Sequence, residues 1–229
     1  MDACSAALDA SLLSHACEGG RGGDVYYFSV CDGDQLTRIA LADVMGHGER
    51  VSEVSQWLFD AMRRRMNDLD GDEILRELNT IALDRGISAM TTAAVGALYR
   101  ADSSFYFSYA GHHPALVLRR GATHWEPATL ERGSDESNLP LGVLPDARYE
   151  QGRLHLRSGD RIAMYTDGLI EAPRSDGELF GIDRLRAVLD REARADLQQT
   201  KTAVLGDVRA HTGGSLVHDD VTLLLAELR

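Results

Sequence analysis

The apolar pattern of the chain changes its period along the sequence, and the resulting order of segments most limits the fold. A run rich in Tyr, Phe and Val predicts a strand at 25–31, and a second strand is expected at 36–44 after a turn. Helical spacing then predicts a helix over 47–66 and a second one ending near Gly86. The later segments predict strands at 92–100, 105–110, 115–119, 153–156 and 161–165. Two helices follow at 182–192 and 197–211, and a last strand at 221–228. Because strands and helices do not alternate one by one, we expect a mostly antiparallel α+β domain.

The length of 229 residues and the hydrophobic content of 44% suit one sizeable core. We therefore expect a single domain over residues 1–229, without a linker or an internal repeat. The segment 127–145 is rich in Gly, Pro, Ser, Asp and Asn and has no sustained period, which predicts a long surface loop. Long loops in compact domains are often functional.

Charge and composition exclude several classes of protein. The formal net charge of −12 disfavours nucleic-acid binding, which needs clustered basic residues. No apolar run approaches the ~20 residues that span a membrane, and residues 1–17 lack the positive start of a secretory signal. Three scattered cysteines indicate reduced thiols, so we expect a cytoplasmic protein that does not bind the membrane.

Five aspartates stand at the ends of predicted strands, and these are Asp24, Asp43, Asp167, Asp219 and Asp220. Glycine is adjacent to Asp24 and to Asp167. If such strand ends converge, the carboxylates repel one another unless a cation neutralises them. Oxygen-only ligands suit Mg²⁺ or Mn²⁺, and two such ions can activate a water for attack on phosphorus. A single aspartate at a strand end is more often a turn former, so the residues alone leave both interpretations open.

Several segments, in order along the chain, resemble the SpoIIE/RsbU/RsbX branch of the PPM (PP2C-like) serine/threonine phosphatases. They are Gly22-Gly23-Asp24, Ala42-Asp43-Val44-Met45-Gly46-His47-Gly48, Tyr109-Ala110-Gly111-His112-His113-Pro114-Ala115, Asn138-Leu139-Pro140-Leu141-Gly142, Tyr165-Thr166-Asp167-Gly168-Leu169-Ile170-Glu171-Ala172 and Asp219-Asp220-Val221-Thr222. Each motif is weak alone, but the ordered set is highly specific. The resemblance implies a sandwich of two mainly antiparallel sheets flanked by helices in αββα layers.

The same resemblance implies a centre of two Mn²⁺ or Mg²⁺ ions. Asp43 is expected to bridge both ions, and the backbone carbonyl of Val44 is expected to bind the second. Asp24 would hold or orient that second ion and its waters.

By the same resemblance, Asp167 and Asp219 are expected to hold the first metal ion, and Asp220 to support the ligands from behind. The four residues assigned to catalysis are thus Asp24, Asp43, Asp167 and Asp219.

The chain departs from the wider family at the position of the proposed general acid. Met45 stands nearest the place of that histidine, and His47 follows at a predicted helix start, where we interpret it as structural. Arg21 lies near the place of the phosphate-binding arginine of eukaryotic members but has no clear match to it. We interpret His112 and His113 as turn residues. The proton donor stays open.

The resemblance implies a phosphoserine or phosphothreonine substrate on a STAS-type signalling protein that acts in stress response and sigma factor regulation. The short segment before Gly19 resembles free-standing RsbX-type members or a detached catalytic module. The helices within 47–85 are expected to bind a partner or a second copy of the chain. A non-catalytic phosphoprotein-binding module and a small phosphoester hydrolase are the alternatives.

Overall fold

The computed structural model describes residues 2–17, 22–31, 33, 35–46, 49–65, 70–86, 89–130, 138–214, 216 and 218–229. The chain divides into two compact units, each assembled from segments distant in sequence. Unit 1 comprises residues 1–20, 115–127 and 157–229, and unit 2 comprises residues 21–114 and 128–156. A single domain over 1–229 stays a prediction.

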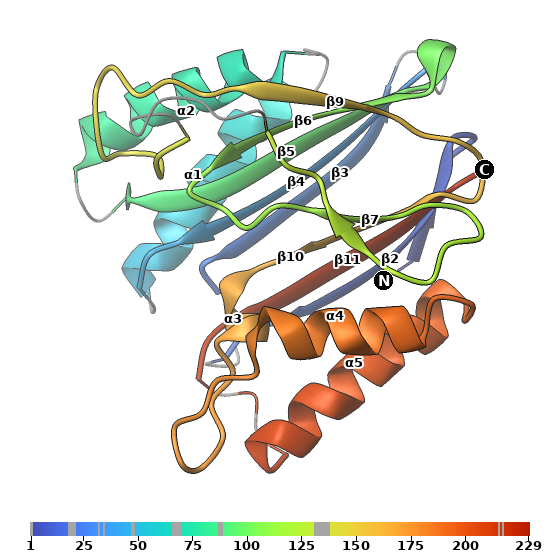
Figure 1. Ribbon diagram of the computed structural model, residues 1–229. Helices are drawn as coiled ribbons and strands as arrows, with labels where there is room; N and C mark the ends of the chain where they lie inside the picture. Colours follow the sequence, from blue (N-terminus) through green and yellow to red (C-terminus); the bar gives the residue numbers. More distant parts are fainter. Residues whose placement is uncertain are drawn as a thin grey trace. The chain divides into compact units, whose positions relative to one another are not determined.

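Unit 2 contains a five-stranded sheet with two helices along one of its faces (Figure 1). The strands follow the order β3 (Asp24–Cys31), β4 (Leu36–Val44), β5 (Thr91–Tyr99), β6 (Ser104–Ala110) and β9 (Gln151–His155), and every neighbouring pair is antiparallel. The helices are α1 (Glu49–Arg64) and α2 (Gly71–Arg85), and a 3₁₀ turn, η2 (Arg100–Asp102), joins β5 to β6.

Alternation along the strands explains which face the helices cover. Val25 and Tyr27 of β3 and Ala42 of β4 point to the same face and belong to one buried cluster with Leu58 of α1 and Leu78 of α2. Such alternate apolar residues are the pattern of a strand that packs against another layer. The burial of this face holds both helices on the sheet.

The end of α2 agrees with the predicted stop. Gly86 follows the helix with φ of 81°, a conformation that glycine adopts readily, and its N–H donates to the carbonyl of Leu83 at 3.1 Å. The start of the predicted 47–66 helix cannot be compared in full, because residues 47, 48 and 66 lie outside the described residues.

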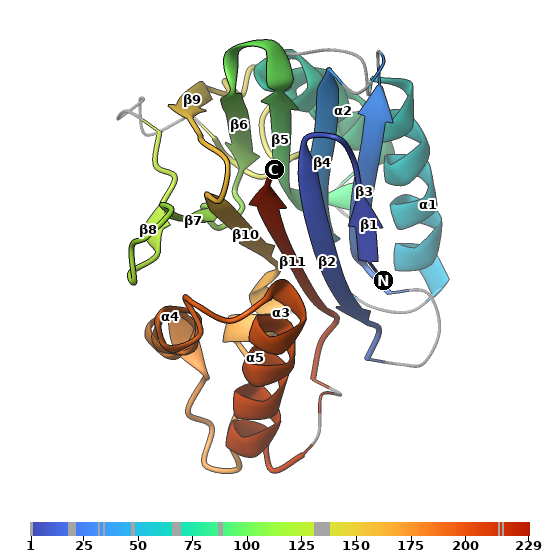
Figure 2. The same cartoon turned by 90° about the vertical axis from the view of Figure 1, so that its right-hand side faces the viewer.

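Unit 1 contains a six-stranded sheet in the order β1 (Asp2–Cys4), β2 (Leu8–His15), β11 (Val221–Leu228), β10 (Arg161–Tyr165), β7 (Leu116–Leu118) and β8 (Glu126–Pro127), again antiparallel throughout. Figure 2 shows β2 and β11 side by side, with β1 folded back along β2. The helices of this unit are α3 (Asp167–Ile170), α4 (Gly181–Arg191) and α5 (Leu197–Thr212).

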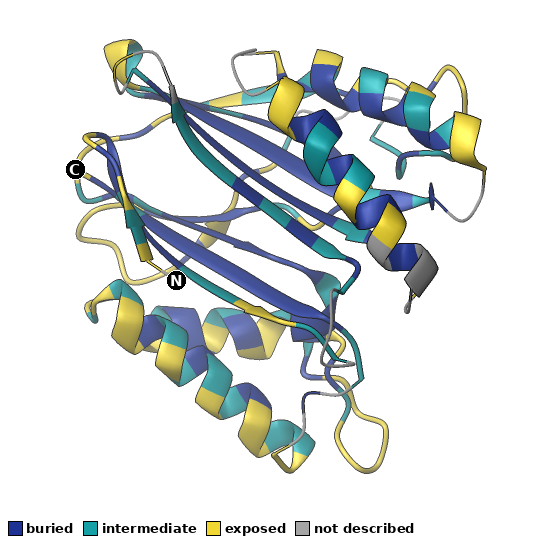
Figure 3. Cartoon of the chain, turned by 180° about the vertical axis from the view of Figure 1, so that it is seen from behind, coloured by how far each residue is buried: buried dark blue, intermediate teal, exposed yellow. Residues whose placement is uncertain are grey.

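Helices α4 and α5 bury one stripe each against this sheet and expose the other side (Figure 3). Leu185 and Leu189 of α4 and Val204 and Val208 of α5 belong to the same buried cluster as the sheet residue Leu223. Helix α5 begins with a capping box, in which the Asp196 carboxylate accepts from the Gln199 N–H and the Gln199 side chain accepts from the Asp196 N–H.

The sequence prediction missed four elements of unit 1, namely β1, β2, β8 and the four-residue helix α3. It described the segment before Gly19 only as rich in small residues, whereas the structure places β2 between β1 and β11 in the sheet. The predicted 127–145 loop is also more ordered than expected in its described part, because Leu141 pairs with Thr91 of β5. In the described part of the chain, none of the helices combines the length and apolar character needed to cross a membrane.

Candidate metal centre

Unit 2 brings two of the predicted ligands together. Asp24, the first residue of β3, is the cross-strand partner of Asp43 near the end of β4, and Asp43 faces Thr92 of β5 on its other side. Side chains directly opposite each other in an antiparallel pair lie within ~4.5–5.5 Å at Cβ. Like charges in this arrangement destabilise a sheet, and a bound cation removes that repulsion.

Close backbone approach shapes the same edge of unit 2. A Cβ atom on Gly23 would lie 2.8 Å from the carbonyl oxygen of Val44 and 3.6 Å from an Asp43 carboxylate oxygen. The Ser55 hydroxyl of α1 lies 3.2 Å from the Gly23 carbonyl oxygen and 2.8 Å from the Val51 carbonyl oxygen, and these two acceptors share its one proton. Glycine at position 23 therefore lets the β3 entry approach the Val44 carbonyl, and α1 holds that entry in place.

Unit 1 places the other three aspartates near one another. Asp167 is the first residue of α3, directly after β10, and Asp219 and Asp220 precede the neighbouring strand β11. The N–H of Asp220 donates to the Asp219 carboxylate at 2.8 Å, and the Asp220 carboxylate accepts from the N–H of Cys17 at 2.8 Å. Asp220 is buried, and its predicted role behind the metal ligands stays a prediction.

Gly168 makes the closest backbone contact of this edge. Its hypothetical Cβ would lie 2.0 Å from the carbonyl oxygen of Asp220 and 3.3 Å from the Cβ of Asp219. His218 adds a contact of 2.7 Å between its Nε2 and the Gly168 carbonyl. Thr166 and Thr222 are joined by two hydrogen bonds, of 2.9 and 3.0 Å, which fix the end of β10 beside the start of β11.

The electrostatics of the unit 1 edge favour a cation. Burial raises the pKa of the Asp219 carboxyl above its usual value, and the hydrogen bond from the Asp220 N–H opposes this shift. The negative charges of Asp167 and Asp220 raise that pKa further. A divalent cation would reverse the sign of the local field and favour the ionised carboxylate.

The donor atoms on both edges fit hard divalent ions. They are carboxylate oxygens and, in unit 2, the carbonyl oxygen of Val44, which are the ligands that Mg²⁺ and Mn²⁺ prefer. In the part of the chain that the structure describes, no three His, Cys, Asp or Glu side chains gather around one point as a ready-made metal site. Each edge nevertheless fits an ion such as Mg²⁺, which retains several waters and uses one or two carboxylates.

The structure describes only some of the other residues considered in the sequence, namely Met45, Arg21 and three histidines. Met45 is 47% exposed after β4, whereas Arg21 and His47 lie outside the described residues. Gly111 has φ of 63°, as a turn requires, and Nδ1 of the next residue, His112, lies 3.0 Å from the His113 carbonyl oxygen. Sequence reasoning assigned no role to Thr92, Thr166 or His218. Thr166 stands inside the Tyr165–Ala172 motif and His218 directly before Asp219, whereas Thr92 is distant in sequence from every recognised motif.

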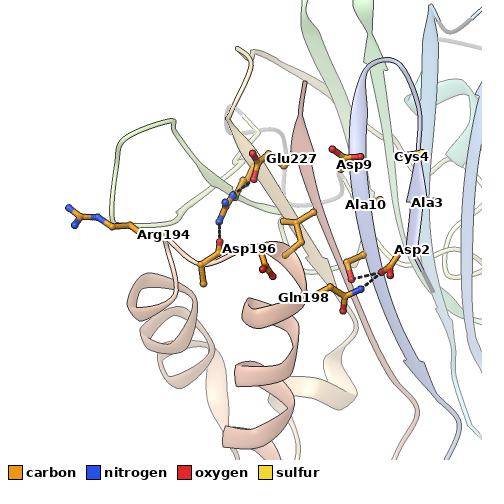
Figure 4. Close-up of a pocket in the computed structure, with 13 residues that line it drawn as sticks. Asp2, Ala3, Cys4, Asp9, Ala10, Arg194, Asp196, Gln198 and Glu227 are labelled. Atoms are coloured by element: carbon orange, nitrogen blue, oxygen red, sulfur yellow. Dashed lines mark hydrogen bonds and ion pairs between the residues drawn. The ribbon is translucent and has the colours of Figure 1, made fainter.

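Unit 1 also contains a cavity of about 580 Å³ beside β1 and the start of α5 (Figure 4). Arg161 on its wall donates to Glu227 at 2.6 Å, and Asp2 accepts from the Ser11 hydroxyl at 2.9 Å. Glu227 stands at the end of β11 away from Asp219. The cavity is therefore separate from Asp167, Asp219 and Asp220, which do not line it.

Comparison with known proteins identifies the family. The model of the family "Stage II sporulation protein E (SpoIIE)" matches residues 33–229. The chain belongs to the SpoIIE family. Its relative "Phosphoserine phosphatase RsbU" of Bacillus subtilis (strain 168) is 24% identical over 208 residues, which cover 89% of this chain and 58% of RsbU. The chain thus spans little more than half the length of this relative.

Solved structures of similar proteins share the fold. The PP2C phosphatase domain of SpoIIE from Bacillus subtilis, solved with a fragment of its regulatory domain, has a TM-score of 0.79 at 21% identity, covering 96% of this chain and 63% of that one. RsbX in complex with magnesium has a TM-score of 0.72 at 16% identity, covering 100% of this chain and 99% of RsbX. The predicted fold class, two antiparallel sheets with flanking helices as in PP2C-type phosphatases, is confirmed.

Proposed function

We propose that this SpoIIE-family chain is a metal-dependent protein serine/threonine phosphatase that acts in the cytoplasm on phosphoserine or phosphothreonine. One observation carries the proposal. The register of β3 and β4 sets Asp24 opposite Asp43, beside the carbonyl of Val44, so that three oxygen donors suited to a divalent cation lie at one edge of the sheet. The magnesium in the related RsbX structure supports a divalent ion here.

In this proposal Asp43 would bridge two Mn²⁺ or Mg²⁺ ions, with Asp24 and the Val44 carbonyl on the second ion and Asp167 and Asp219 on the first. When bound, the ions would supply positive charge to the phosphoryl oxygens and a water of lowered pKa. Two glycines allow the backbone to position these donors. Because neither has a side chain, Gly23 can approach the Val44 carbonyl and Gly168 can approach the Asp220 carbonyl.

Phosphate release from three substrates tests the proposed function. The wild-type chain, with Mn²⁺ or Mg²⁺, is incubated with p-nitrophenyl phosphate, a phosphoserine peptide and a panel of phosphorylated STAS-domain proteins. We expect turnover that EDTA abolishes, with kcat/KM highest for the phosphoproteins. Turnover of small esters alone would favour the small phosphoester hydrolase, and binding of phosphoproteins without turnover would favour the non-catalytic module.

The proposed substrate is a STAS-type protein of a stress-response or sigma-factor pathway. The printed name of the relative RsbU, a phosphoserine phosphatase, supports the phosphoserine part of this proposal. A second supporting feature is the similarity to a chain solved in a study of the bacterial stressosome, with a TM-score of 0.66 and 17% identity.

We further propose that a partner or a second copy of the chain binds the helices within 47–85 and sets the metal affinity of Asp43. Helices α1 and α2 are joined by the Arg85 guanidinium, 4.7 Å from the centre of the Trp57 ring. Helix α1 also holds the Gly23 carbonyl beside Asp43 through Ser55. A shift of α1 would therefore reach the metal-binding edge of the same unit.

Replacing Trp57 by Ala tests this role. We expect Trp57→Ala to weaken Mn²⁺ binding and activity several-fold, because it removes one of the contacts between α1 and α2. Gln56→Ala, on the exposed side of α1, should leave both unchanged. Isothermal titration with Mn²⁺, assays at several Mn²⁺ concentrations and sedimentation of both variants provide the measurement. Wild-type metal affinity and activity in Trp57→Ala would contradict the role of this position.

A further inference from the structure

Two neighbouring apolar side chains are exposed at the tip of the 138–150 loop in unit 2. Val143 is 40% exposed and Leu144 is 41% exposed. Single exposed hydrophobic residues are normal on protein surfaces. An adjacent exposed pair is less ordinary, and here the loop that carries Val143 and Leu144 is fixed to the rest of the unit, which keeps both side chains at the surface.

A buried asparagine fixes the tip. Asn79 of α2 has no exposed surface, and its amide nitrogen donates to the Leu144 carbonyl at 2.8 Å. Its side-chain oxygen accepts from the N–H of Gly142, also at 2.8 Å. A single carboxamide thus holds the backbone on both sides of Val143. Figure 1 shows this loop, in yellow, beside α2.

The base of the loop is held equally firmly. Leu141 and Thr91 exchange two backbone hydrogen bonds, of 2.8 and 3.2 Å. The Gly111 N–H donates to the Asn138 carbonyl at 2.6 Å, and the Asn138 side chain accepts from the Glu150 N–H at 3.0 Å. The exposed pair therefore sits on a loop whose two ends and tip are all fixed.

The loop also lies at the end of the sheet that carries the predicted ligands. Thr91, the partner of Leu141, is the cross-strand partner of Val44. Two strand spacings of about 5 Å and two residue steps of about 3.4 Å place Val143 within roughly 17 Å of Val44. An extended peptide crosses that distance in about five residues.

We propose that Val143 and Leu144 form a docking surface for an apolar side chain of the phosphoprotein substrate, three to five residues from its phosphoserine. Asn79 acts as the positioning residue that holds this surface. The proposal rests on the phosphatase activity proposed above, and it adds a preference of substrate sequence to that activity. A polar neighbour at the same place in the substrate would leave both side chains exposed.

Two matched peptides test the docking surface. One carries leucine three to five residues on either side of phosphoserine, and the other carries serine at those places. We expect the wild-type chain to prefer the leucine peptide about tenfold in kcat/KM, since burial of apolar surface favours its complex. The double variant V143S/L144S should lose this preference, with turnover of the serine peptide and of p-nitrophenyl phosphate unchanged. Leu179→Ser, which alters a residue 47% exposed in unit 1, should keep the preference.

A second variant tests the role of Asn79. Asn79→Ala should raise KM for the leucine peptide several-fold at unchanged kcat, while p-nitrophenyl phosphate turnover stays at the wild-type level. A general loss of folding would instead lower turnover of all substrates together, and a thermal melt identifies that case. In that case V143S/L144S, which changes only exposed side chains, tests the docking surface in place of Asn79→Ala.

The remaining outcomes are distinguishable. Equal kcat/KM of the wild-type chain for both peptides, or an undiminished preference in V143S/L144S, would overturn the docking surface while turnover of p-nitrophenyl phosphate upholds the phosphatase. A wild-type chain that releases no phosphate from any substrate would overturn the proposed function and the docking surface with it.

Discussion

Replacing Asp43 by Asn is expected to lower Mn²⁺-dependent phosphate release at least about a thousandfold, equivalent to about 4 kcal/mol of transition-state stabilisation. The proposal makes Asp43 the shared ligand of both ions, and a neutral carboxamide is a poor bridge between cations. The variant retains the size of the side chain, so the loss reports charge. Initial rates with p-nitrophenyl phosphate over a range of Mn²⁺ concentrations provide the measurement.

Asp43→Asn is also expected to change how Mn²⁺ affects the melting temperature, which is a test independent of activity. Because Asp24 and Asp43 are cross-strand partners, removing one charge should not lower the melting temperature of the metal-free chain. Mn²⁺ should raise the melting temperature of the wild-type chain but not of Asp43→Asn, since a ligand stabilises only the state that binds it. Asp60→Asn, which alters a partly exposed carboxylate of α1 near Arg63, should behave as wild type. Equal Mn²⁺ stabilisation of both chains would exclude Asp43 as a ligand.

Gly168→Ala is expected to destabilise the chain by about 3 kcal/mol and to abolish most activity. A Cβ placed 2.0 Å from the Asp220 carbonyl oxygen cannot be accommodated without moving the backbone of Asp219 and Asp220. For a protein of this size, that loss lowers the melting temperature by roughly 6–12 °C. Differential scanning calorimetry and the p-nitrophenyl phosphate assay measure the two effects.

Gly206→Ala is the matched control. Gly206 lies within α5, and no atom lies within 4 Å of its hypothetical Cβ. Alanine favours a helix interior over glycine by about 1 kcal/mol, so the control should be slightly more stable than wild type and fully active. A wild-type melting temperature and activity in Gly168→Ala would show that the close contact with Asp220 does not constrain the site.

Much of the fold could be predicted where local pattern and tertiary role agree. The strands β4, β10 and β11 have the predicted bounds, because each is a largely apolar run with polar residues or glycine close to at least one of its ends. Strand β2 was missed for the opposite reason. Its residues Leu8–His15 show no simple alternation, and its stability depends on pairing with β11, far away in the sequence.

In the candidate site, too, some features could be predicted from local sequence and others depend on contacts between distant segments. The turn between the two strands predicts that Asp24 begins the hairpin sequence and that Asp43 comes near its end. Their direct pairing depends on register, which the hydrophobic pattern alone leaves open. The Gly168 contact was beyond prediction, because it joins the end of β10 to the residue before β11. Asn79 gave no signal, since a polar residue in a helix is ordinarily exposed.

The pairing of β2 with β11 has a consequence for synthesis on the ribosome. In unit 2, strands β3, β4, β5 and β6 pair in the order in which they are made, so that part of the sheet can assemble as the chain emerges. In unit 1, residues 8–15 must wait for residues 221–228, which are translated after every other strand of that sheet. Until then β2 presents an unpaired edge, and a nascent chain stalled before residue 221 is the form most exposed to aggregation and chaperone capture.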